Sequence, residues 1–233
     1  MLIYYIVIIA VQVLSLVITH TIKSNSPVIL TVYGSSTVDM ATTIFLFVVG
    51  LCTFKENFGM LLQNGFSRRS ILVGRVLSFG AIAGLMTIID LLLTLLFNMI
   101  GNAVGNFSVT TTFEVIYGSG GFGWQLLGVL CTFLLYLAVL LVGYCISLMF
   151  YRLGKLGKVL VGAGVPALVG IVGPILDLIF TGGKNYSAID NFFTVIFGYD
   201  QHQPWYAVAT LTVISLLVSL CTWLMLRRAT VRK

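Results

Sequence analysis

The stretch KENFGMLLQNGFSRR, from Lys55 to Arg69, lies between two apolar segments that are each long enough to cross a bilayer. Apolar side chains recur in and just before it at steps of three and four residues, the spacing of one stripe on a helix. The members of this stripe are Phe54, Phe58, Leu61, Leu62 and Phe66. Asn64-Gly65 predicts the end of that helix, and Ser67 can cap the next one. The stretch therefore predicts a short amphipathic helix at a membrane surface, which can lie on lipid or dock into a partner protein.

The composition makes the lipid bilayer the solvent for most of the chain. Of its 233 residues, 59% are hydrophobic and only 9% are charged, and the mean hydropathy is +1.08. A soluble domain carries about a quarter charged residues. The net charge of +6 is spread between apolar runs, so it predicts no nucleic-acid partner. The four cysteines all fall inside apolar runs without ligand spacing, so neither a disulfide nor a metal site is expected.

Apolar runs predict an all-α integral membrane fold with six spanning helices in a single transmembrane domain, residues 1–233. Their approximate bounds are 2–22, 36–54, 68–100, 123–151, 159–180 and 204–226. The first run is apolar from its start and has neither a basic leader nor a cleavage site, so we expect it to be a retained span. Within 68–100, Gly80 and Gly84 are four residues apart, a weak signal for close helix approach.

Capping boxes mark three helix starts, at residues 36–39, 111–114 and 187–190, and the first of them begins the span at 36–54. The second predicts a short surface helix that ends near Gly118. The third precedes NFFTVIF and Gly198, and predicts a short outer helix, interfacial or re-entrant, between the fifth and sixth spans.

Basic residues fall mainly on one side of this six-span arrangement. Ten of them belong to the loop 55–69, the loop 152–158 and the C-terminal tail: Lys55, Arg68, Arg69, Arg152, Lys155, Lys158, Arg227, Arg228, Arg232 and Lys233. Only Lys23 and Lys184 fall on the other side. Since basic loops remain in the cytoplasm, this bias places both termini there.

No motif predicts an enzyme. The chain has no HExxH, and Gly182-Gly183-Lys184 is followed by Asn185, so it lacks the Ser or Thr that a Walker A motif needs for magnesium. If the protein uses ATP, the nucleotide and its magnesium bind another chain.

Asp90 and Asp177 interrupt apolar runs, where a carboxylate is costly and tends to face a cavity or a polar partner. Thr94 and Asn98 lie four and eight residues after Asp90 and extend a polar stripe on its helix face. This stripe can line a substrate path. Alternatively, Asp90 forms an interhelical hydrogen bond or takes up a proton. For Asp177 an interfacial position is favoured.

The pattern of two spans, then KENFGMLLQNGFSRRSILVGR, then a long third span resembles the permease subunits of ABC-2-type exporters. The resemblance is greatest to the small permeases of Gram-positive bacteria that export peptides or antimicrobials. It implies a coupling helix at about 55–66, a separate ABC ATPase subunit, and a second permease copy or paralogue in the bacterial plasma membrane. The chain differs from many relatives in lacking an amphipathic helix before its first span.

The resemblance also implies roles for particular residues. Four apolar side chains would enter a cleft on the ATPase: Phe58, Leu61, Leu62 and Phe66. Polar contacts around it would come from Lys55, Glu56, Arg68 and Arg69. The same apolar face and basic flanks also fit a helix that lies on anionic lipid.

Together these observations predict the membrane subunit of an ATP-driven exporter for an amphipathic or hydrophobic substrate, such as a peptide, an antimicrobial or a lipid. The chain itself is expected to bind no cofactor. The alternative is a membrane-embedded immunity or sensor protein that binds a toxin peptide without an ATPase.

Overall fold

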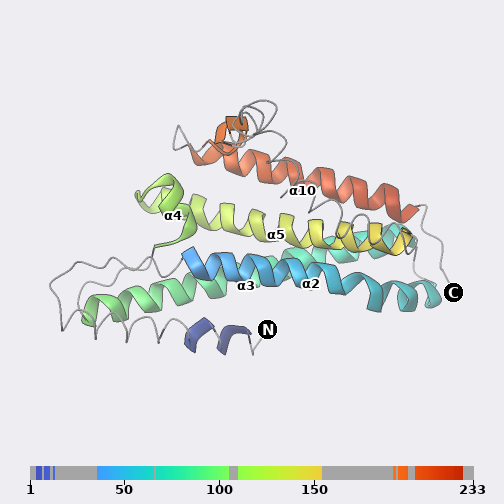
Figure 1. Ribbon diagram of the computed structural model, residues 1–233, viewed down its shortest axis with the longest axis horizontal. Coiled ribbons are helices and arrows are strands. Elements are labelled where there is room, and N and C mark those ends of the chain that lie inside the picture. The colour runs from blue at the N-terminus through green and yellow to red at the C-terminus, as the bar shows by residue number, and fades with distance from the viewer. Residues whose placement is uncertain are drawn as a thin grey trace, which may run out of the picture.

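The computed structural model describes residues 4–6, 8–10, 13, 36–65, 67–104, 110–153, 191–192, 194–198 and 203–227. This part of the chain is all-helical and has no strand. Its elements are α2 (Ser36–Gln63), α3 (Arg68–Val104), α4 (Thr112–Tyr117), α5 (Phe122–Arg152) and α10 (Pro204–Arg227). Apart from the short α4, these helices run alongside one another down the length of the molecule (Figure 1).

Three segments are long and apolar enough to cross a membrane: Arg68–Ile100, Phe122–Arg152 and Pro204–Arg227. They indicate a multi-pass membrane protein and match three of the predicted spans to within one residue. The α2 helix contributes a shorter apolar part, Val38–Phe54. The predicted span at 159–180 lies outside the described residues, and so does most of the one at 2–22.

The α2 helix differs from the prediction because it continues through Lys55 to Gln63 without a break. The sequence predicted a span that ends near Phe54 and a separate helix over about 55–66. Between these two parts there is neither Gly nor Pro, and the apolar stripe stays in phase across the junction, so nothing ends the helix there. The predicted coupling segment is therefore a direct extension of α2.

The turn after α2 has the predicted form. Gly65 has a φ of 77°, a left-handed conformation that ends the helix at little cost only because glycine has no Cβ. The side chain of Ser67 then accepts a hydrogen bond from the backbone N–H of Ser70 at 3.1 Å, which caps α3.

The α5 helix is the centre of the bundle and contacts α2, α3, α4 and α10. Its sequence is apolar on all sides, as expected of a helix with neighbours around it. Tyr136, Leu140, Tyr144 and Leu148 of α5 are almost completely buried in the main core. Neighbouring helices add Leu46, Phe54, Phe79, Met86 and Leu226 to this core.

The backbones of α2 and α5 come close together at Gly50 and Gly143. A Cβ atom at Gly143 would lie 2.6 Å from the carbonyl oxygen of Phe47 and 3.2 Å from the Cα of Gly50. The sequence had pointed to Gly80 and Gly84 instead. A Cβ at Gly80 would meet no described atom within 4 Å, and one at Gly84 would meet only the Phe133 ring, at 3.8 Å.

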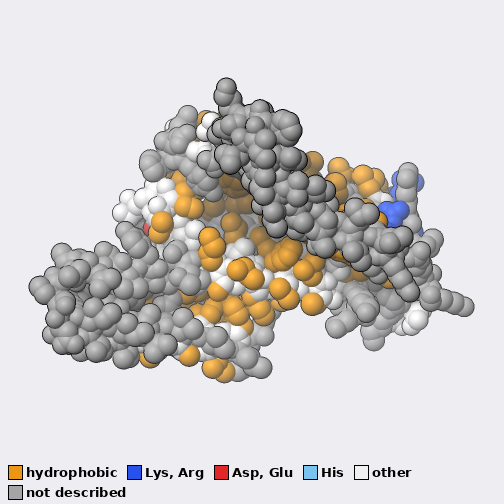
Figure 2. Space-filling view, viewed as in Figure 1, with side chains coloured by type: hydrophobic (Ala, Val, Ile, Leu, Met, Phe, Trp, Pro, Cys, Tyr) orange, Lys and Arg blue, Asp and Glu red, His pale blue; other side chains and the backbone are white. Residues whose placement is uncertain are grey.

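One end of the bundle carries the described basic side chains of the helix termini. The Arg68 guanidinium, at the start of α3, donates to the backbone carbonyls of Leu226 and Arg227 at the end of α10. Arg152 and Arg227 line one shallow cavity at the same end. Figure 2 shows Lys and Arg side chains at this end, an acidic side chain toward the other, and apolar side chains between them.

The glycine contact yields a stability prediction. Gly143→Leu drives a side chain into the α2 backbone, so it should destabilise the bundle by about 1–3 kcal/mol or prevent its assembly. Thermal unfolding of the purified protein, followed by circular dichroism, measures this loss. Gly80→Leu is the matched control and should change the midpoint little, since no described atom lies within 4 Å of a Cβ at Gly80. Equal effects of the two substitutions would contradict this role of Gly143.

Candidate functional site

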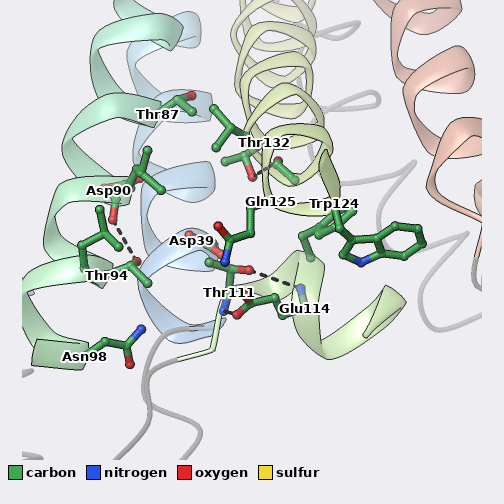
Figure 3. Close-up of a pocket in the computed structure, with 15 residues that line it drawn as sticks. Asp39, Thr87, Asp90, Thr94, Asn98, Thr111, Glu114, Trp124, Gln125 and Thr132 are labelled. Atoms are coloured by element: carbon green, nitrogen blue, oxygen red, sulfur yellow. Dashed lines mark hydrogen bonds between the residues drawn. The ribbon is translucent and has the colours of Figure 1, made fainter. Parts of the chain in front are cut away.

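A cavity of about 130 Å³ lies between α3, α4 and α5, near the start of α2. We call it the polar cavity, because most of the side chains in Figure 3 that face it can form hydrogen bonds. Its polar lining consists of Asp39, Thr87, Asp90, Thr94, Asn98, Thr111, Glu114, Gln125 and Thr132. Four helices thus contribute to one site at the end opposite Arg68 and Arg227.

The polar stripe predicted on α3 lines this cavity. Asp90, Thr94 and Asn98 follow one another along the helix on the side that faces α4 and α5 (Figure 3). The Thr94 hydroxyl donates to the Asp90 backbone carbonyl at 2.9 Å, so this threonine needs no partner from another helix. The structure therefore brings together the three residues that the sequence had assigned to a possible path.

Asp90 lies at the inner end of this stripe and is only 3% exposed. Its Oδ2 accepts a hydrogen bond from the Tyr136 hydroxyl of α5 at 2.7 Å. Its Oδ1 lies 3.4 Å from the Tyr5 hydroxyl, which also contacts Met86 Sδ at 2.7 Å. These donors offset part of the cost of a carboxylate among apolar helices. Asp90 thus makes an interhelical hydrogen bond, one of the alternatives that the sequence left open, and it also lines a cavity.

Asp39 attaches α4 to the start of α2. Its Oδ2 accepts a hydrogen bond from the backbone N–H of Thr112 at 2.8 Å. The sequence had predicted a capping box over residues 36–39 with Ser36 as its cap; the side chain of Ser36 and the residue before it lie outside the described part. The Asp39 carboxylate is used between helices, and no local pattern indicates a partner 73 residues further along the chain.

The α4 helix has the capping box that the sequence predicted. The Thr111 hydroxyl accepts from the Glu114 N–H at 3.2 Å, and Glu114 Oε2 accepts from the Thr111 N–H at 3.1 Å. At its other end Gly118 has a φ of 84°, and the Tyr117 hydroxyl donates to the carbonyl of Phe197 at 2.6 Å. These bonds fix α4, and with it Glu114, beside the polar cavity.

A second cavity, of about 230 Å³, lies between α2, α4, α5 and α10. We call it the apolar cavity, since its lining includes Met40, Ile44, Ile116, Leu135, Phe197 and Leu211. The two cavities share Asp39, Phe113 and Thr132. Sequence reasoning missed this second cavity because its walls come from segments far apart in the chain.

All the charged side chains in the described lining of the polar cavity are acidic. Three carboxylates line it, those of Asp39, Asp90 and Glu114, and its described lining contains no Lys or Arg. Within the described ranges, these and the remaining His, Cys, Asp and Glu side chains form no group of three that could hold a metal ion. The polar cavity therefore presents negative charge and hydrogen-bond acceptors.

The residues expected to contact an ATPase are described only in part. Leu61 is half-buried and packs against the main core, while Arg68 and Arg69 are exposed. The Arg68 guanidinium is already hydrogen-bonded to the end of α10. The side chains of the other five lie outside the described part: Lys55, Glu56, Phe58, Leu62 and Phe66.

Arg75 is a further cation that the sequence analysis did not single out. Its guanidinium carbon lies 5.7 Å from the ring centroids of both Phe79 and Tyr144. Such cation–π contacts stabilise a guanidinium away from water. Arg75 therefore has a structural explanation within the core and lies outside both cavities.

Comparison of the chain with protein-family models, curated proteins and solved structures finds no match.

The Asp90–Tyr136 pair should be strongly coupled. Tyr136→Phe leaves a buried carboxylate without its nearest donor, so it should lower the free energy of unfolding by about 1.5–3 kcal/mol. The double variant with Asp90→Asn should lose less free energy of unfolding than the sum of the two single variants, because either single change already removes the hydrogen bond. Measured free energies of unfolding of the parent protein, the two single variants and the double variant complete this double-mutant cycle. Strictly additive effects would contradict the coupling.

The Asp39 contact should control the order of α4. Asp39→Ala removes the acceptor for the Thr112 N–H, so amide hydrogen exchange over residues 112–117 should become faster by about five- to tenfold. Asp39→Asn keeps an acceptor oxygen and should have a smaller effect. Unchanged exchange in the alanine variant would show that α4 does not depend on this bond.

Proposed function

We propose that the chain is the membrane-spanning subunit of an ATP-driven exporter and moves an amphipathic or hydrophobic substrate out of a bacterial cell. A separate ABC ATPase subunit binds and hydrolyses the ATP. Six spans place both termini in the cytoplasm, and two permease chains, identical or paralogous, form the pathway in the plasma membrane. The resemblance of the segment around residues 55–75 to ABC-2-type permeases motivates this proposal.

The extension of α2 is the observation that carries the proposal furthest. The helix continues from Phe54, where its apolar part ends, to Gln63, which adds nine residues or about 14 Å. It then turns at Gly65 into α3, whose apolar span of 33 residues is about 50 Å long against a hydrocarbon core of about 30 Å. Both helices are therefore long enough to extend beyond the membrane at the end that carries the basic side chains.

The α2 and α3 helices form a hairpin that is joined at the turn near Gly65, and both helices line the polar cavity. Asp39 is in the first turn of α2, and Asp90 is in the far half of α3. A force that a partner applies to the tip near Asn64 and Gly65 thus acts on two helices that line the cavity at their other ends. ATP binding draws the two ATPase subunits together, and the hairpins transmit that movement to the cavity.

A carboxylate-lined cavity inside a helical bundle fits the transport of a solute. Ionisable groups within membrane helices usually face a cavity or a pathway, where water and substrate compensate them. A sensor that binds a peptide without an ATPase would also use such a cavity. The hairpin distinguishes the two proposals, because only the exporter needs a partner at its tip.

Co-purification tests the proposal directly. The chain is co-expressed with the ATPase encoded nearest to it, and the complex is measured in lipid nanodiscs. Leu62→Asp should abolish the complex and its stimulated ATP hydrolysis, since an acidic side chain cannot enter an apolar cleft. Leu61 is less suitable because it also packs against the core.

Gln63→Asp is the matched control, since this neighbouring side chain is exposed at the end of α2. It adds the same charge and should leave the complex intact. If the chain binds no ATPase, or if Leu62→Asp leaves the complex unchanged, the exporter is rejected in favour of the sensor.

A further inference from the structure

We infer that the two cavities together form a binding chamber for an amphipathic cation. Its ammonium or guanidinium group occupies the polar cavity, and its apolar chain occupies the apolar cavity. This assignment rests on the proposed function only where it treats the ligand as the transported substrate. Binding itself requires no ATPase.

The sign of the charge follows from the lining of the polar cavity. The carboxylates of Asp39, Asp90 and Glu114 come from three different helices and reach the same space (Figure 3). The described arginines at the helix ends are at the opposite end of the bundle, so they do not neutralise these carboxylates. A cation gains from all three charges, whereas an anion would be repelled by each of them.

Hydrogen bonding favours a cation that also donates protons. Tyr136 and Tyr5 donate to the two oxygens of Asp90, at 2.7 and 3.4 Å, and the Thr112 N–H donates to one oxygen of Asp39. A carboxylate accepts several hydrogen bonds, so further acceptor sites remain on these two groups. Primary ammonium and guanidinium groups supply donors, and their bonds to carboxylates are among the stronger ones in proteins.

The apolar cavity indicates what the rest of the ligand is like. It is larger than the polar cavity, about 230 Å³ against 130 Å³, and aliphatic and aromatic side chains form most of its wall. Apolar cavities of this kind bind hydrocarbon groups in preference to water. A ligand with an alkyl chain or an apolar side chain beside its cation therefore matches both spaces.

The geometry of the shared wall supports joint occupancy. Asp39, Phe113 and Thr132 line both cavities, so a ligand that reaches past them contacts the carboxylates and the apolar wall together. The Phe113 ring packs on Gly128, where a Cβ would lie only 2.9 Å from it. This contact fixes the position of a ring that borders both spaces.

Octylammonium is the probe that tests the charge. Its binding to the purified chain in nanodiscs is measured by calorimetry, with lipid-only nanodiscs subtracted. Gln125 lines the polar cavity and is exposed, so its substitution should leave the fold intact. Gln125→Glu should tighten binding by about fivefold, and Gln125→Lys should weaken it by at least as much.

Octyl sulfate is a second test of the charge, since it has the same chain and the opposite charge, and it should not compete with octylammonium.

One variant and a shorter ligand test the apolar half. Leu211→Trp fills the apolar cavity and should weaken octylammonium binding about tenfold, while butylammonium, which has little apolar chain to place there, should be almost unaffected. Competition by octyl sulfate, or equal affinities of the two Gln125 variants, would overturn the inference.

The result is separable from that of the exporter test. Loss of the ATPase complex with intact octylammonium binding would reject the exporter and keep the chamber. An intact ATPase complex with no octylammonium binding above the lipid background would reject the chamber and keep the exporter.

Discussion

The close backbone contact between α2 and α5 at Gly50 and Gly143 is the interaction on which the described bundle most depends. In lipid, an apolar helix surface gains little by leaving its surroundings, so helices associate through close packing and through hydrogen bonds between them. Gly50 and Gly143 provide the close packing. Tyr136, about two turns before Gly143 on α5, provides a hydrogen bond between helices through its bond to Asp90 of α3. Because α5 also contacts α4 and α10, its position determines where the cavities form.

The two ends of the bundle have different chemistry, and long helices join them. Arg68 and Arg227 meet at one end, whereas Asp39 and Glu114 lie at the other. The α2 and α3 helices extend over nearly the whole distance, from the turn near Gly65 to the polar cavity, which both of them line. Asp39 also attaches the short helix α4 to α2. Such an arrangement suits a protein that converts movement at one membrane surface into a change of access at the other, as we propose.

Local features of this fold could be predicted because their causes are local. The helix starts at Arg68, Phe122 and Pro204 follow from where long apolar runs begin, to within one residue. Gly65 and Gly118 end helices because only glycine adopts their positive φ at little cost. The capping box of α4 closes over four consecutive residues. The apolar part of α2 ends at Phe54 as predicted, but the separate helix expected after it was wrong, because a change from apolar to mixed composition does not end a helix unless a residue there breaks the hydrogen-bond pattern.

The sequence by itself therefore determined the helical class, three of the spans, the turns between helices, and the presence of Asp90, Thr94 and Asn98 on one helix face. Only the tertiary structure decided what these residues meet. Asp90 and Tyr136 are 46 residues apart, and Asp39 and Thr112 are 73 apart. Among the described residues, the glycines at a close helix contact are Gly50 and Gly143, whereas Gly80 and Gly84 meet no described backbone within 4 Å. The physical reason is that periodicity gives the face of a helix on which a residue lies, whereas the partner of that face depends on how whole helices pack.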